Sequence, residues 1–173
     1  MIFEGEYING KRNGKGKEYD SNGELIFEGE YLKGNRWNGK VKEYDSKGEL
    51  IFEGEYLNGK RNGKGKEYYY NGKLKYEGEY LNDERNGKGK EYYDDGKLKF
   101  EGEYLNGKKW NGKSFNVNGI KEFDIINGNG KIKEYYPNGK LKFENENLDG
   151  ERNGEGKEYY EDKLIFEGKY LMD

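Results

Sequence analysis

The sequence predicts an all-β chain, an elongated and twisted single-layer antiparallel meander of repeated β-hairpins. One segment recurs along the chain, and an aromatic residue opens a new copy every 20 to 25 residues. Within each copy, large apolar residues or glycines alternate with charges at the strand period of two. Asn-Gly pairs, which favour hairpins because both residues tolerate positive φ, separate the alternating runs. The opening aromatic residues are Phe3, Phe27, Phe52, Tyr76, Phe100, Phe123, Phe143 and Phe166.

The third copy shows the repeated unit most clearly. Its opening strand, 52–57, reads Phe-Glu-Gly-Glu-Tyr-Leu, and its closing strand, 64–68, reads Lys-Gly-Lys-Glu-Tyr. An Asn-Gly turn follows each strand. A connection this short cannot cross over to a parallel neighbour, so we expect successive hairpins to pair edge to edge.

The pleat of the strands assigns the side chains to two faces. Tyr76 and Gly78 share one face, the ring face, where glycines leave hollows into which neighbouring rings can lie. Glu77 and Glu79 share the other, the charged face, where they form cross-strand ladders with lysines. Strict alternation fails near Glu67, where a β-bulge is expected.

Composition limits what such a chain can bury. Only 31% of the residues are hydrophobic and 39% are charged, which by itself is typical of disorder. Aromatic residues make up 16%, including 18 tyrosines, and each ring buries a large area with few rotors. We therefore expect one sheet covered by rings and lysine stems rather than a two-layer core.

No linker or charge block divides the chain, so residues 1–173 are expected to form a single array. No stretch approaches 18 apolar residues, and Met1 to Phe3 are already in repeat phase. We therefore expect neither a membrane span nor a signal peptide, and a cytoplasmic location. The expected units are 3–26, 27–51, 52–75, 76–99, 100–122, 123–142 and 143–165, with a half unit at 166–173.

Two features interrupt the repeat. Ile125 and Ile132 replace two glycines of the unit 123–142, and we expect them to pack against each other or a shared neighbour in a denser core. The alternative is a break in sheet curvature that presents a partner site. Trp37 and Trp110 are expected in the first loop of their units, either folded back on the sheet or contacting a ligand at a loop tip.

The repeated residues resemble a known family. Tyr-Glu-Gly-Glu-Tyr at 76–80 and Asn-Gly-Lys-Arg-Asn-Gly-Lys-Gly at 58–65 resemble the MORN repeat (membrane occupation and recognition nexus). Lys-Glu-Tyr-Tyr…Asn-Gly-Lys-Leu at 66–74 is similar to the MORN repeat variant of bacterial and protist proteins, and some bacterial members carry an antitoxin label. The resemblance covers about the whole chain and implies the fold. It implies little about function, because MORN arrays have many different functions.

The residue types argue against an enzyme. The chain has no histidine to act as a base near neutral pH and no cysteine to act as a nucleophile or metal ligand. Carboxylate pairs such as Glu53 and Glu55 recur beside lysines, whereas a catalytic pair is singular and desolvated. Residues 107–114 fit the P-loop pattern, but no helix is expected after them to hold a phosphate. We expect no catalysis, no cofactor and no metal.

The remaining expectation is a non-catalytic scaffold that binds protein partners through its aromatic and glycine face. One alternative is a phosphoinositide or membrane-surface module, and another is an antitoxin-like neutraliser of a partner protein. The net charge of −3 gives no whole-chain attraction to nucleic acid or anionic lipid, and nucleic acid is not an expected partner. The candidate protein-binding residues are Tyr31, Tyr56, Tyr80, Tyr104, Trp37 and Trp110.

The first and last strands raise the question of assembly. Each is expected to leave a row of unpaired backbone groups, only partly blunted by charges. We therefore expect weak end-to-end self-association, or a partner that covers the edges. The candidate edge residues are Phe3, Tyr7, Phe166 and Tyr170.

Overall fold

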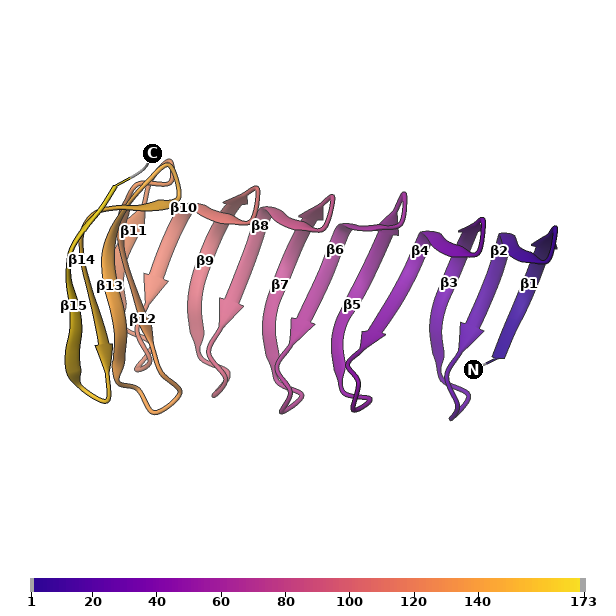
Figure 1. Ribbon diagram of the computed structural model, residues 1–173, viewed down its shortest axis with the longest axis horizontal. Coiled ribbons are helices and arrows are strands. Elements are labelled where there is room, and N and C mark those ends of the chain that lie inside the picture. The colour runs from indigo at the N-terminus through magenta and orange to yellow at the C-terminus, as the bar shows by residue number, and fades with distance from the viewer. Residues whose placement is uncertain (1, 172–173) are drawn as a thin grey trace. The chain divides into compact units, whose positions relative to one another are not determined.

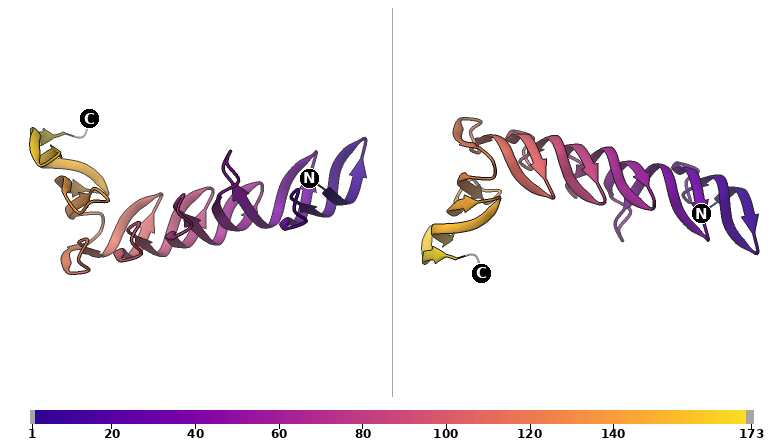
Figure 2. Two further views of the ribbon diagram at one scale, coloured as in Figure 1. Left: turned by 90° about the horizontal axis from the view of Figure 1, so that it is seen from below. Right: turned by 90° about the horizontal axis from the view of Figure 1, so that it is seen from above.

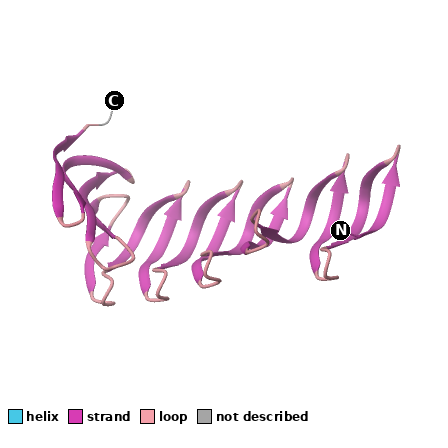
Figure 3. Ribbon diagram, turned by 60° about the horizontal axis from the view of Figure 1, so that its bottom comes forward, coloured by secondary structure: helices cyan, strands magenta, loops and turns pink. Residues whose placement is uncertain are grey.

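The computed structural model describes residues 2–171, which form strands and turns without a helix (Figures 1 and 3). None of these residues therefore belongs to a helix that could span a membrane. The chain divides into two compact units, residues 1–84 (unit 1) and 85–173 (unit 2). The strands are β1 (Ile2–Ile8), β2 (Lys11–Tyr19), β3 (Leu25–Leu32), β4 (Asn35–Tyr44), β5 (Leu50–Leu57), β6 (Lys60–Tyr68), β7 (Leu74–Leu81), β8 (Glu84–Tyr92), β9 (Leu98–Leu105), β10 (Lys108–Phe115), β11 (Lys121–Ile125), β12 (Gly130–Tyr135), β13 (Leu141–Leu148), β14 (Glu151–Tyr160) and β15 (Lys163–Tyr170).

Each unit is an antiparallel meander in which strands pair with their sequence neighbours. In unit 1, β1 to β7 pair in order and lie in one twisted layer (Figure 2). In unit 2, β8 to β11 pair in order, and β12 to β15 form a separate four-stranded sheet. Odd-numbered strands are the opening strands and even-numbered strands the closing strands. The predicted all-β architecture of repeated hairpins is confirmed.

A row of glycines lets the strands and rings approach closely on the ring face. Gly54 and Gly65 pair directly between β5 and β6. A Cβ added to Gly65 would lie 2.7 and 2.8 Å from ring atoms of Phe52 and 3.0 Å from the ring of Tyr80. Phe52 is 0% exposed, because its ring fills the space that the glycines leave open. The predicted glycine hollows are therefore present.

The charged face carries the predicted ladder. Lys66 of β6 pairs with Glu53 on one side and Glu77 on the other. Its Nζ lies 3.4 Å from a Glu53 carboxylate oxygen. The register shifts between Glu67 and Tyr68, which confirms the predicted bulge. Alternation along β6 places Tyr68 on the charged face, where its hydroxyl donates a 2.6 Å hydrogen bond to Glu53.

The expectation that the unit 123–142 forms a hairpin like the others is wrong, because its strands β11 and β12 are joined only by the isolated bridge Ile126–Asn129. In repeat phase, Ile125 and Ile132 would take the places of a directly paired glycine couple. A Cβ on Gly54 would lie 2.9 Å from the Cα of its partner, so that register has no room for two isoleucines. Each isoleucine keeps its pairing on the other side of its strand: Ile125 with Gly112, where it is 2% exposed, and Ile132 with Asn145. Contact between the two isoleucines stays a prediction.

Candidate interaction surface

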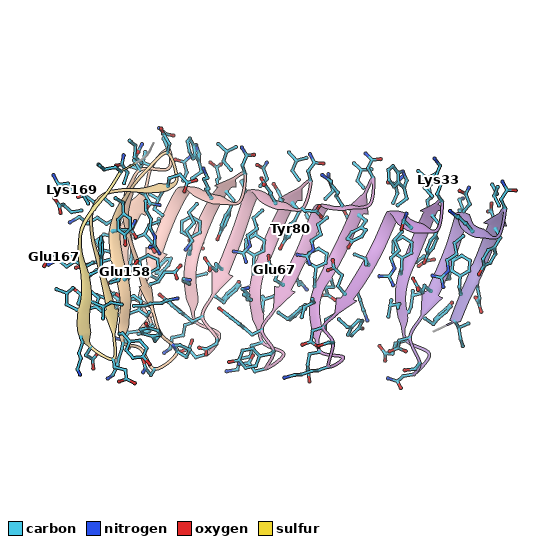
Figure 4. The ribbon with its side chains drawn as sticks, in the orientation of Figure 1. Lys33, Glu67, Tyr80, Glu158, Glu167 and Lys169 are labelled. Atoms are coloured by element: carbon cyan, nitrogen blue, oxygen red, sulfur yellow. The ribbon has the colours of Figure 1, made fainter. Side chains whose placement is uncertain are left out.

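The four candidate tyrosines of the ring face lie inside the array. Tyr31, Tyr80 and Tyr104 are 3%, 4% and 3% exposed, and Tyr56 is half-buried. Each hydroxyl donates to a glutamate of the preceding closing strand, as Figure 4 shows for Tyr80 and Glu67. The donor–acceptor distances are 2.9 Å for Tyr31 to Glu18, 3.0 Å for Tyr56 to Glu43, 2.6 Å for Tyr80 to Glu67 and 3.5 Å for Tyr104 to Glu91.

In unit 1, arginines stack on aromatic rings of the same face and bond the same glutamates. Arg61 places its guanidinium carbon 4.1 Å from the centre of the Phe52 ring and donates hydrogen bonds of 2.9 and 2.6 Å to Glu43. Arg12 and Arg36 donate to Glu18, each at 2.9 Å. Such stacking and charge-assisted bonds desolvate the rings without leaving a charge unpaired.

These contacts shift the acidity of the buried groups. Burial by itself would raise the pKa of Glu18, but hydrogen bonds from Arg12, Arg36 and Tyr31 outweigh it, so the pKa lies below its ordinary value. Burial, reinforced by the hydrogen bond to Glu18, raises the pKa of Tyr31 to about 12. The ring face is therefore a desolvated and internally bonded layer around these residues.

In unit 2, two lysines join Arg85 around a buried carboxylate. Glu91 lies 3.1 Å from Lys99 Nζ and 2.8 Å from Lys109 Nζ, and Lys99 also lies 3.3 Å from Glu134 of β12. Burial alone would raise the pKa of Glu91, yet the fields of Lys109 and Lys99 hold it well below its ordinary range. This network connects the sheet β8–β11 with the sheet β12–β15.

The two tryptophans lie in strands rather than in the predicted loops. Trp37 belongs to β4 and Trp110 to β10, each at a register shift against the opening strand. Both are half-buried, and their rings lie against the turn glycines of the next hairpin, Gly59 and Gly128. Each tryptophan carbonyl also accepts the N–H of that glycine, at 2.7 and 2.8 Å. Loop position was expected because the glycine-rich flanks read as turns.

The candidate edge residues are more exposed than their counterparts inside the sheets. Tyr7 is 58% exposed and Phe166 is 38% exposed, while Phe3 and Tyr170 are half-buried. The equivalent Phe27 of β3 is 1% exposed. The difference arises because β3 has a closing strand on both sides, whereas β1 and β15 have one strand neighbour each among the described residues.

A row of exposed aliphatic residues, which we call the leucine row, follows the tyrosine position of the opening strands. Alternation places these side chains on the charged face, opposite the buried tyrosines. They are 37 to 57% exposed. The sequence signal was an Ile or Leu after the tyrosine of an opening strand, or after Asn147 in β13, which reads as an ordinary strand end until the burial of its neighbours is known. The members are Ile8, Leu32, Leu57 and Leu81 in unit 1, and Leu105 and Leu148 in unit 2.

The turns beside the leucine row are anchored to the preceding hairpin. The N–H of Gly34 donates to the carbonyl of Arg12 at 2.9 Å, and the N–H of Asp83 donates to that of Arg61 at 3.0 Å. Asn38 adds a side-chain bond, accepting the N–H of Asn58 at 2.8 Å. The leucine row is therefore presented by a fixed backbone, which lowers the entropy lost on binding.

The charged face is hollowed beside the row. In unit 1 a hollow of about 430 Å³ lies above Gly16 and Gly29, with Lys17 and Glu28 among its walls. Glu30, two residues before Leu32, also lines it. A partner that covers Leu32 therefore meets charges of both signs beside an apolar contact.

Two family models match the chain. The model of the MORN repeat matches residues 3–24, 52–73, 76–97 and 148–164. The model of the MORN repeat variant matches residues 37–58 and 128–146. The first three MORN matches begin at the opening aromatic residues Phe3, Phe52 and Tyr76. No curated protein matches the chain.

Proposed function

The chain belongs to the MORN-repeat proteins, and from that premise we propose that it is a non-catalytic platform that binds a protein partner along its leucine row. Extended arrays commonly bind on a surface that repeats with the unit. The supporting observation is the exposure of Leu57 and Leu81, each 47%, at the same position of successive opening strands. The sequence hypothesis chose the ring face instead. The burial of Tyr31 and Tyr80 favours the opposite face.

The spacing of the row fits an amphipathic helix. Neighbouring members are two strand spacings apart, about 9.6 Å. A helix returns to the same face after seven residues, about 10.5 Å. The mismatch accumulates to only about 3 Å over the four members in unit 1, which side-chain rotamers can absorb. A helix with an apolar residue at every seventh position, flanked by both charges, therefore fits Ile8, Leu32, Leu57 and Leu81.

A peptide of defined sequence tests the surface directly. The probe is a fluorescent helix of about 21 residues with leucine at every seventh position and mixed Glu and Lys elsewhere. We expect the chain to bind it, and Leu32→Ser with Leu57→Ser to weaken binding about tenfold or more, because exposed aliphatic anchors are lost. Tyr70→Ser is the matched control, since Tyr70 is 79% exposed but lies in a turn outside the row.

The same assay decides between the two faces. Retained binding in the folded leucine variant, together with loss in a folded Tyr56→Ser and Tyr80→Ser variant, would assign the partner to the ring face. A peptide of equal composition and scrambled order should not bind. Co-sedimentation with vesicles that contain or lack anionic lipid separates this function from membrane-surface recognition.

A further inference from the structure

One ion pair of the charged face is reversed relative to the rest of the array. Opening strands carry glutamate on both sides of a central residue, which is glycine as in Glu4-Gly5-Glu6 or asparagine in β13, except that β15 reads Glu167-Gly168-Lys169 and β11 lacks the motif. The opposing closing strand changes with it, because Glu155 stands where other closing strands have lysine. Glu155 and Lys169 pair in the register, and Lys169 Nζ lies 3.4 Å from the Glu155 carboxylate.

The reversal alters the outer edge of a sheet. β15 is an outer strand of the sheet β12–β15, and no other strand of residues 2–171 pairs with its free side (Figure 1). Ile165 is 61% exposed, Phe166 38% and Leu171 79%. Figure 4 shows Glu167 and Lys169 on this strand. An exposed strand edge with apolar residues is a template for pairing with another strand.

We propose that the β15 edge pairs with the β15 edge of a second copy of this chain, antiparallel and two-fold symmetric about Gly168. In this register Glu167 faces Lys169 of the second copy, and Lys169 faces its Glu167. Phe166 faces Tyr170 on the ring face, and Ile165 faces Leu171 on the charged face. A two-fold interface needs such a self-complementary patch. Opposite charges and aromatic pairs are the cross-strand neighbours that stabilise a sheet.

The proposed contact between copies extends the alternation of lysine and glutamate that crosses neighbouring strands inside the sheet. Inside unit 1, Lys66 lies between Glu53 and Glu77. In the paired copies, Lys169 lies between Glu155 of its own chain and Glu167 of the other. Glu167 in turn lies between Lys157, 2.9 Å away in its own chain, and the Lys169 of the other.

Competing arrangements of the edge strands are less complementary. Two β1 edges centred on Gly5 place Glu4 against Glu6 twice, which is repulsive. A β1 edge on a β15 edge gives one attractive contact, Glu4 with Lys169, and one repulsive contact, Glu6 with Glu167. If the two-fold axis of the β15–β15 pair passes through Glu167 or Lys169 instead of Gly168, that residue faces its own equivalent, and like charges meet. Among the end-to-end associations that the sequence led us to expect, the observations thus favour a closed pair through β15.

Charge-reversal variants that preserve the ion pairs between β14 and β15 test this interface, although the second variant sets its new glutamate at position 157 opposite Glu144 of β13. The double variant Glu155→Lys with Lys169→Glu keeps the pair within the chain but presents two glutamates at the edge. The double variant Lys157→Glu with Glu167→Lys likewise presents two lysines. Sedimentation over about a hundredfold range of concentration measures association of each chain.

The wild-type chain is expected to shift from 20.3 kDa toward twice that mass as its concentration rises. Each double variant alone should associate at least about tenfold more weakly than the wild type. An equal mixture of the two variants should recover association. Far-ultraviolet circular dichroism checks that both variants are folded. A monomeric wild type, undiminished association of either folded variant, failure of the mixture to recover, or growth beyond two copies would each overturn the proposal.

Discussion

One glutamate position recurs in the closing strands, and the burial of the glutamate there should determine how much it contributes to the stability of the fold. The same repeat position is filled by Glu91 in unit 2, Glu43 in unit 1 and Glu158 in β14, with side-chain exposures of 11%, 21% and 36%. Replacement of each by glutamine keeps the shape and removes the charge. We expect the loss of unfolding free energy to rank Glu91 above Glu43 above Glu158.

The magnitude follows from what each replacement leaves behind. Lys99 and Lys109 are each 13% exposed, so Glu91→Gln leaves buried ammonium groups without their carboxylate. Breaking a buried pair costs about 3–5 kcal/mol. Lys99 keeps Glu134, so the lower end, about 3 kcal/mol, is expected. Arg152 is 40% exposed beside Glu158, and a pair of that kind contributes about 0.2–1 kcal/mol.

Urea unfolding followed by circular dichroism measures the three losses at neutral pH. Repeating the urea unfolding at acid pH tests the direction of the pKa shift of Glu91. The pKa of Glu91 is lower in the folded chain than its ordinary 4.5, so its contribution is present above pH 4.5 and disappears as pH falls toward the folded value. In the Glu91→Gln variant, the unfolding free energy should therefore fall less steeply as the pH is lowered below 4.5. Equal losses at the three positions, or an equally steep fall in the variant, would refute the role of burial.

Two further predictions concern the ring face. Gly65→Ala should cost about 1–3 kcal/mol by overpacking, because the new Cβ meets the Phe52 ring, and Phe52→Leu should partly relieve that cost in the double variant. The pKa values of Tyr31 and Tyr56 are raised from 10.0 to about 12, so their stabilising contribution is complete below pH 10 and is lost as pH rises through about 12. Spectrophotometric titration should show that the buried part of the 18 tyrosines ionises only with alkaline unfolding, and ionisation of all 18 near pH 10 in the folded chain would contradict this.

Period and alternation were sufficient to predict the hairpins, the two faces and the bulge at Glu67, because each depends on residues close in sequence. The break after β11 depends instead on the distance between paired glycines, which no pattern of residue types contains. The burial of Tyr56 likewise depends on Glu43, which precedes it by 13 residues and reads locally as one more solvated charge. Candidate binding residues were therefore chosen for their chemistry before their neighbours were known.

The strict alternation of opening and closing strands also limits how such a gene can change in length. Deletion of β4 together with β5 would still leave the opening strand β3 beside the closing strand β6, with Glu28 between Lys17 and Lys66. Deletion of β4 alone would bring the Glu28 and Glu30 of β3 against Glu53 and Glu55 of β5. Insertions and deletions of whole hairpins should therefore survive selection, whereas changes by a single strand should not.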